Sequence, residues 1–259
     1  MVNFSSKIIF LGTGTGVPSA ERASPSVLLQ LPSANVLIDI GPGTLRQLAL
    51  ISIPVTKINY ILLTHLHPDH CADLGPFLFA GKYPPFLADR RQCILLAGRA
   101  IEQFFIDLNG LYGRWIEWPP GLFTIKSLPQ ERPWEEEFPE FTLQSTPVAH
   151  TSSSLGFRIT LPNGKGLVFS GDSDYSASLV ELAQKADILI CECSFPEEEK
   201  VTGHLTPSLA GRIAREAGVG RLYLTHFYPE CRGKDLIGPC NREYRGPIFL
   251  AEDFQIVPI

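Results

Sequence analysis

Seven consecutive residues hold half of the histidines in this chain. The heptad Thr64-His65-Leu66-His67-Pro68-Asp69-His70 contains three of the six histidines and one carboxylate. Imidazole nitrogens and a carboxylate oxygen suit Zn²⁺, and also Mn²⁺ or Fe²⁺. The apolar run at 58–63 predicts a buried strand directly before the heptad. Such a polar cluster is costly to hold beside a core without a ligand, so the heptad predicts a metal site.

The spacing within the heptad favours more than one metal ion. Side chains two residues apart on an extended chain point to the same side, which would bring His65 and His67 together. Asp69 and His70 would follow in a turn and face another direction. One loop could therefore contribute to two metal sites.

Other polar residues of the same types also follow predicted strands. Apolar or alternating runs predict strands over 141–148, 166–170, 188–192 and 221–225. These strands lead to His150, Asp172, Glu192 and His226. The last histidine, His204, precedes a predicted helix with Thr206 as N-cap, Pro207 at its first position and Gly218 after its end. Asp39 interrupts an apolar run, and we interpret it as a carboxylate that supports the metal loop from outside.

The remaining elements alternate between strands and helices. We expect strands over 7–11, 26–31, 36–40, 92–96 and 155–161, and helices over 44–49, 73–79, 101–111 and 176–185. The glycine-rich stretch 12–16 is not followed by a helical pattern, which favours a loop near the metal pocket over a dinucleotide-binding turn. Residues 112–140 have the least regular pattern, and they could wall a substrate pocket or pack on the body of the protein.

The composition bounds the class of protein. With 259 residues, 44% hydrophobic and 19% charged, the chain is expected to form a single globular domain over 1–259. Its net charge is −5, with 10 basic and 8 acidic residues in 1–130 and 12 and 19 in 131–259. No broad basic face is implied, which argues against strong non-specific binding of nucleic acid.

The sequence shows no signal-peptide core and no apolar run long enough to cross a bilayer, so the expected location is cytoplasmic, with no membrane as a partner. Six scattered cysteines are expected to be reduced. Cys191 and Cys193, which flank Glu192, could serve redox chemistry or bind metal, but small buried packing residues are favoured.

The residues described above resemble the metallo-β-lactamase superfamily. Its hallmark His-x-His-x-Asp-His appears as His65-x-His67-x-Asp69-His70. Within the superfamily the chain is similar to the ribonuclease Z group, in the segments Leu11–Gly14, Asp39–Thr44, Ser170–Asp172, Glu192 before a Ser-Phe pair, and Leu224–Phe227. The resemblance implies an α/β fold, the αββα four-layer sandwich, and a dinuclear-metal hydrolase that uses a metal-bridging hydroxide.

The resemblance also implies a role for each site residue. One metal ion, expected to be Zn²⁺ with Mn²⁺ or Fe²⁺ as alternatives, would be bound by His65, His67 and His150. A second would be bound by Asp69, His70 and His226, with Asp172 bridging both ions. Catalytic roles are implied for Asp69 and for the pair His204 and Glu192, which would deliver a proton to the leaving oxygen. A buried salt bridge is the alternative role for Glu192.

Departures from the group bear on the substrate. The long basic arm that tRNA-processing members insert is absent, because His150 and Asp172 are only 22 positions apart. Pro68 stands where glycine is common, and Cys191–Ser194 replaces the usual His-Glu-Ala-Thr. These departures argue against tRNA as a partner but leave metal-assisted hydrolysis intact. Our hypothesis is a phosphodiesterase that acts on a small-molecule or nucleotide-containing ester. A homodimer is compatible with the sequence.

Three alternatives to a phosphodiesterase are left open. The same site could hydrolyse a thioester, a lactone or a sulfate ester. Oxygen-reducing di-iron proteins share the fold but replace the second motif histidine with glutamate, so His67 argues against them. A non-catalytic metal-binding protein is a further alternative.

Overall fold

The computed structural model describes residues 6–83 and 91–259. Within these ranges no helix is both long and apolar enough to span a bilayer. The strands form two sheets. The first contains β1 (Lys7–Gly12), β2 (Ser26–Gln30), β3 (Asn35–Ile38), β4 (Tyr60–Leu63), β5 (Cys93–Gly98), β6 (Phe123–Leu128) and β14 (Ile256–Pro258), in the order β14-β1-β2-β3-β4-β5-β6. The second contains β7 (Trp134–Glu137), β8 (Thr142–Pro147), β9 (Leu155–Thr160), β10 (Gly166–Phe169), β11 (Ile188–Glu192), β12 (Arg221–Thr225) and β13 (Ile248–Leu250), in the order β13-β12-β11-β10-β9-β8-β7.

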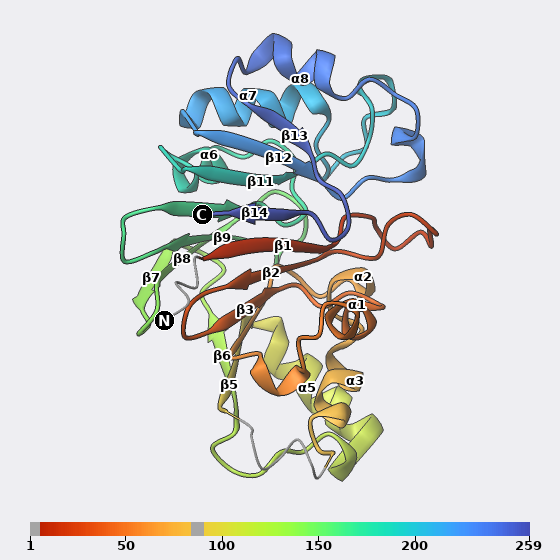
Figure 1. The fold of residues 1–259 in the computed structure, drawn as a ribbon, viewed down its shortest axis with the longest axis vertical. Coiled ribbons are helices and arrows are strands. Elements are labelled where there is room, and N and C mark those ends of the chain that lie inside the picture. The colour runs from red at the N-terminus through yellow and green to blue at the C-terminus, as the bar shows by residue number, and fades with distance from the viewer. Residues whose placement is uncertain (1–5, 84–90) are drawn as a thin grey trace.

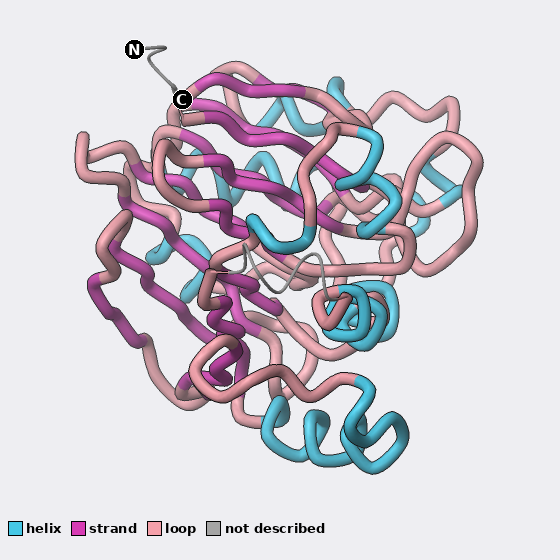
Figure 2. Tube along the Cα trace, turned by 60° about the horizontal axis from the view of Figure 1, so that its bottom comes forward, coloured by secondary structure: helices cyan, strands magenta, loops and turns pink. Residues whose placement is uncertain are grey.

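Helices cover the outer face of each sheet (Figures 1 and 2). They are α1 (Thr44–Leu50), α2 (Pro68–Cys71), α3 (Leu74–Ala80), α5 (Ala100–Tyr112), α6 (Ala177–Leu182), α7 (Pro207–Ala217) and α8 (Ile237–Glu243). Short 3₁₀ turns lie at Val55–Lys57, Gly113–Trp115, Glu197–Glu199 and Pro229–Cys231.

Three apolar clusters hold these layers together. Phe10, Leu143 and Phe157 belong to the cluster between the two sheets, where inward-facing side chains of both sheets meet. A second cluster joins the first sheet to α1, α3 and α5, and a third joins the second sheet to α6, α7 and α8. The order helix, sheet, sheet, helix confirms the αββα sandwich. That residues 1–259 form one domain stays a prediction.

Parallel strands direct the polar residues to one edge of the sandwich. Strands β3 to β6 run parallel to one another, and so do β10 to β13. Ligands in open α/β sheets bind beyond the carboxyl ends of such strands. Asp39 follows β3, His65 follows β4, and Asp172 and His226 follow β10 and β12.

The sequence-based prediction was wrong in some segments. Residues 112–140, expected to be irregular, contain β6 and β7, which lie at the ends of their sheets. Three of the four residues of β7 are glutamates, a composition that hides a strand but suits an exposed edge. The helix expected over 176–185 spans only 177–182. Asp69 and His70 lie in the one-turn helix α2, not in a plain turn.

Candidate metal centre

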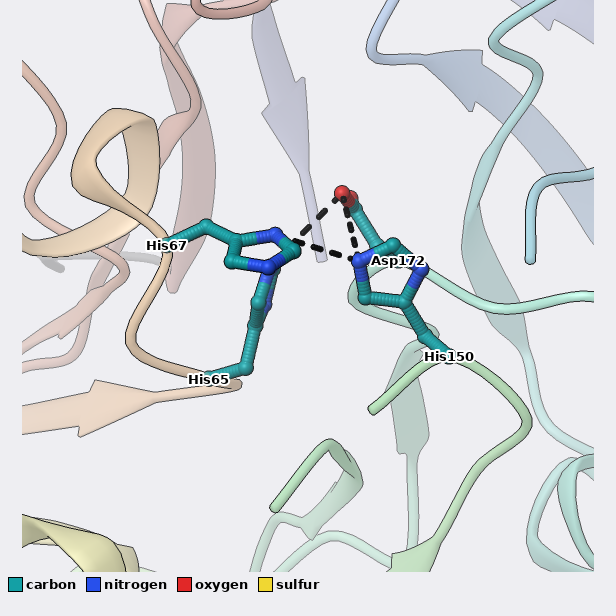
Figure 3. Close-up of side chains that lie close together, drawn as sticks. All are labelled: His65, His67, His150 and Asp172. Carbon is teal, nitrogen blue, oxygen red and sulfur yellow. Dashed lines mark hydrogen bonds and ion pairs between the residues drawn. The ribbon is translucent and has the colours of Figure 1, made fainter. Parts of the chain in front are cut away.

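Three histidines and an aspartate form the first group of potential ligands. Figure 3 shows the side chains of His65, His67, His150 and Asp172 pointing toward one another. His67 Nδ1 lies 3.2 Å from His150 Nε2. Asp172 Oδ2 lies 3.7 Å from His65 Nε2 and 3.8 Å from His150 Nε2. The four ligand atoms are all within 4.8 Å of one another, so this group is able to hold a metal ion.

Asp69, His70 and His226 form the second group. Asp69 Oδ2 lies 3.8 Å from His70 Nε2 and 3.6 Å from His226 Nε2. The two Nε2 atoms are 3.2 Å apart. The heptad therefore contributes to both groups, as its spacing predicts.

Asp172 lies between the two groups. While its Oδ2 faces His65 and His150, its Oδ1 lies 3.3 Å from His70 Nε2 and 3.4 Å from His226 Nε2. The side chain is almost entirely buried, with 4% of its surface exposed. One carboxylate thus presents one oxygen to each group.

The backbone adopts costly conformations to bring these side chains together. His226 and Asp39 have φ values of 61° and 58°, in the left-handed region that residues other than glycine rarely adopt. Gly171, with φ of 57°, precedes Asp172, and a Cβ there would lie 2.7 Å from the Cβ of Thr64. Strain of this kind is concentrated at functional sites.

Hydrogen bonds orient the imidazole rings from behind. Asp39 Oδ2 lies 2.8 Å from His70 Nδ1, which confirms the predicted contact of Asp39 with the heptad. The carbonyl oxygen of Gly203 lies 2.9 Å from His150 Nδ1. An acceptor at Nδ1 places a hydrogen on that nitrogen, so Nε2, which faces the cluster, is the atom whose lone pair a metal ion would take.

The residues fit a cation. The buried atoms His65 Nε2 and Asp172 Oδ1 have no hydrogen-bond partner in the described part of the chain. Unpaired buried polar atoms are energetically costly. Both atoms belong to the cluster of potential ligands, where a cation would satisfy them. Imidazole nitrogens and carboxylate oxygens are donors that divalent ions such as Zn²⁺, Mn²⁺ or Fe²⁺ take in proteins.

The ionisation of the cluster supports the same conclusion. Burial lowers the pKa of His65 to about 2, so the ring stays neutral. Burial favours the neutral form of Asp172, yet His226 and His70 hold its pKa well below the usual range. Burial lowers the pKa of His70, but Asp172 and Asp39 outweigh it and raise this pKa well above normal. Asp172 is therefore ionised at the centre of the cluster, and its negative charge attracts a cation.

Comparison with known proteins assigns this arrangement to a family. The beta-lactamase superfamily domain matches residues 34–227. The chain belongs to the beta-lactamase superfamily. It is 31% identical over 225 residues to a Bacillus subtilis protein named "Probable metallo-hydrolase YhfI", covering 85% of this chain and 86% of that one. The Ribonuclease Z of Methanothermobacter thermautotrophicus is 27% identical over 297 residues, covering 98% and 96%.

Solved structures agree with this superfamily assignment. The YhfI crystal structure has a TM-score of 0.84 at 27% identity and covers 98% of this chain and 99% of its own. The short form of human tRNase Z has a TM-score of 0.78 at 24% identity, with coverage of 98% and 99%, which supports the fold alone. The chain is thus a metallo-hydrolase of the beta-lactamase superfamily with ribonuclease Z-like relatives.

In this metallo-hydrolase, the predicted pair His204 and Glu192 lies beside the candidate metal centre. His204 Nδ1 is 3.0 Å from Glu192 Oε1 and 4.0 Å from Asp172 Oδ2. Burial lowers the pKa of His204, but the hydrogen bond and charge of Glu192 outweigh it and raise this pKa. Glu192 is 1% exposed and also accepts hydrogen bonds from the backbone of Ser173 and Leu205, at 2.7 and 3.1 Å. It is a buried acceptor that fixes the ring of His204.

Two aromatic rings and a cavity complete the surroundings. Phe195 and Tyr228 stack with ring centroids 4.6 Å apart, and their centroids lie 5.7 and 5.9 Å from that of His204. Tyr228 also lines a cavity of about 640 Å³, together with residues of the loop 14–22. This loop approaches the centre, because a Cβ at Gly16 would lie 3.4 Å from the Cβ of Asp69. The glycine-rich stretch therefore lies at the metal pocket, as expected.

The structure brings together all nine site residues that the sequence singles out. Sequence reasoning assigns no role to Thr64, Ser194, Phe195 or Tyr228, all of which contact the centre. Each follows a strand and lies within three residues of a predicted site residue, and Ser194 and Phe195 are the Ser-Phe pair that contributes to the resemblance. The six cysteines are free and buried, which agrees with the prediction of reduced packing residues.

Proposed function

We propose that the protein is a dinuclear-metal phosphodiesterase. The observation that carries the proposal is the division of seven donor residues into two groups that share Asp172. The first ion would be held by His65, His67, His150 and Asp172 Oδ2. The second would be held by Asp69, His70, His226 and Asp172 Oδ1, with Zn²⁺ as the ion that the donor set favours. When bound, such a pair of ions supplies a nucleophile from water and Lewis acidity toward both the attacking and the leaving oxygen.

The protein residues around the ions would position a proton. Because Glu192 is an acceptor, the Nδ1 of His204 carries a hydrogen, which leaves Nε2 to exchange a proton with the leaving oxygen. The Ser173 and Leu205 amides and the Glu192 carboxylate hold this ring in place. Asp69 would act through its ligation of the second ion.

A phosphodiester is favoured over other esters because a relative that matches nearly the whole chain is a ribonuclease. A tRNA substrate is disfavoured. The segment between His150 and Asp172 forms the hairpin of β9 and β10, which leaves no room for an arm. The described residues that line the cavity of about 640 Å³ include no predicted metal ligand, but Tyr228, whose ring centroid lies 5.7 Å from that of His226, joins the cavity to the centre. Its volume is within the range of about 300–1,000 Å³ that small ligands fill. A small-molecule or nucleotide-containing diester is therefore the proposed substrate, and free thiols favour a cytoplasmic setting.

A substrate panel tests this proposal. The purified protein loaded with Zn²⁺ is assayed on bis(p-nitrophenyl) phosphate, an acyl thioester, a lactone and an aryl sulfate. We expect the diester to be preferred, and Asp172→Ala or His67→Ala to abolish both metal binding and turnover. If the protein prefers the thioester, the lactone or the sulfate, the proposal of a phosphodiester substrate is wrong and that compound gives the substrate class. Full turnover in both variants would refute the metal-dependent mechanism.

A further inference from the structure

Asp39 holds two histidines of the metal centre, one directly and one through a hydroxyl. Its Oδ2 lies 2.8 Å from His70 Nδ1. Thr64 Oγ1 donates a hydrogen bond to the same oxygen at 2.9 Å and lies 3.1 Å from His65 Nδ1. Both Asp39 and Thr64 are buried.

Glu192, on the other sheet, repeats this arrangement. Its Oε1 contacts His204 Nδ1 directly at 3.0 Å. Ser194 Oγ donates a hydrogen bond to its Oε2 and lies 2.9 Å from His226 Nδ1. Glu192 and Ser194 are 1% and 0% exposed, so water does not compete for these bonds. Each buried carboxylate therefore reaches one histidine directly and another through a buried hydroxyl.

The single hydrogen of each hydroxyl determines the state of the histidine behind it. A carboxylate can only accept, so the hydroxyl must donate its hydrogen there. The hydroxyl oxygen can then only accept from the imidazole, which places a hydrogen on Nδ1 of His65 and of His226. The lone pair of each neutral ring is consequently on Nε2, the atom that faces the metal centre.

We propose that Thr64 and Ser194 are positioning residues, each of which fixes the tautomer and orientation of one metal-binding histidine. Thr64 serves His65 and so the first ion; Ser194 serves His226 and so the second. The inference rests on the proposed function, because it takes His65 and His226 as ligands. It assigns roles to two residues that touch no ion themselves.

Ser194 has a second consequence. Its hydrogen bond is one of four that Glu192 accepts, the others coming from Ser173, His204 and Leu205. The histidine of the second ion and the ring of His204 are therefore fixed by the same carboxylate. Loss of the Ser194 hydroxyl should disturb both.

Metal titration by calorimetry on the full chain, with Zn²⁺ alone, tests the proposal. Thr64→Val and Ser194→Ala each remove one hydroxyl, whereas Thr64→Ser and Ser194→Thr keep it. Removal of such an outer contact typically costs about 10- to 100-fold in metal affinity. We expect each hydroxyl-removing variant to weaken one binding step by that factor, and each hydroxyl-keeping variant to stay within a few-fold of the original chain.

A second background separates positioning from general damage. His226→Gly removes the histidine that Ser194 contacts and so weakens the second group, leaving the first group as the remaining site; glycine also tolerates the positive φ at that position. In this background Ser194→Ala should no longer change the affinity of the remaining site, whereas Thr64→Val should still weaken it. The melting temperature of each metal-free variant checks that the chain is folded.

Three outcomes would overturn the proposal. Ser194→Ala could weaken the remaining site of His226→Gly as much as it weakens the original chain. Both hydroxyl-removing variants could weaken the two binding steps equally, or leave both unchanged.

If Ser194→Ala does not fold, the pair Thr64→Val and Thr64→Ser tests the same proposal at His65. An original chain that fails to bind two ions would count against the proposed function itself, whereas two ions bound normally by all variants would refute this inference alone.

Discussion

The Nε2 atoms of His70 and His226 lie 3.2 Å apart, although the two residues are separated by 156 positions in the chain. The Nδ1 atom of each ring contacts an oxygen on its other side, from Asp39 and from Ser194 respectively. Both Nε2 atoms thus face the carboxylates of Asp69 and Asp172. A divalent ion bound here would take the lone pairs of both rings and the two carboxylates together.

Removal of metal should abolish activity and lower stability. A ligand that binds only the folded chain adds about 2.7 kcal/mol at 100 times its dissociation constant. We expect dialysis against a chelator to eliminate hydrolysis of bis(p-nitrophenyl) phosphate and to lower the melting temperature, and Zn²⁺ to restore both. Mg²⁺ provides the control, because it prefers oxygen ligands and should restore neither. Undiminished activity after chelation would contradict the account.

Replacement of His204 should impair proton delivery without loss of metal. General acid catalysis contributes about 10²- to 10⁴-fold, and an alkoxide leaving group needs it more than p-nitrophenolate does. The comparison uses an alkyl ester of p-nitrophenyl phosphate, which can release either the alcohol or p-nitrophenolate. His204→Ala should therefore slow the release of the alcohol far more than it slows the release of p-nitrophenolate. Metal content should stay at the level of the original chain. Loss of an ion would instead make His204 a ligand, since it also lies near Asp172 and His226.

Close backbone approach makes Gly41 irreplaceable. A Cβ at this position would collide with the carbonyl oxygen of Asp69, so Gly41→Ala must displace the loop that carries the heptad. We expect a loss of stability and weaker metal binding, measured by denaturant unfolding and calorimetry. The matched control is Gly110→Ala in α5, where a Cβ meets nothing within 4 Å. Because alanine is favoured over glycine in a helix, that variant should gain about 0.5–1 kcal/mol. Equal effects at both positions would argue against the close approach.

The interior between the sheets should be sensitive to cavities. Phe157 is 0% exposed in the cluster that joins the two sheets. Phe157→Ala should cost about 3–5 kcal/mol in the free energy of unfolding. Ile106→Ala, at a position 62% exposed, should change it by less than about 0.5 kcal/mol. A neutral Phe157→Ala would show that this cluster does not stabilise the sandwich.

The parts of the fold that sequence could predict are those with strong local signals. The buried strands before His65, Glu192 and His226 are short apolar runs, and their ends locate the site residues. The edge strand β7 escaped prediction because its glutamates face an exposed border. The contacts of Ser194 with Glu192 and His226 could not be predicted, because they depend on how β11 and β12 lie side by side.

The N-terminus of α7 also contains a contact that local sequence could not predict. Thr206 occupies the predicted N-cap position, yet its side chain makes no capping hydrogen bond. Glu197, from the 3₁₀ turn Glu197–Glu199 that precedes α7, instead accepts from the backbone N–H of Ser208 at 2.6 Å. Local sequence located the start of the helix, but tertiary structure supplied its cap.

The count of metal ions bound per chain tests the central claim most directly. The protein is dialysed against excess Zn²⁺ and freed of unbound metal, and its zinc content is measured by elemental mass spectrometry. The account predicts two ions per chain in the original protein and loss of both affinities when Asp172, which serves both groups, is replaced by alanine. One ion or none in the original chain, or two ions retained by Asp172→Ala, would contradict it.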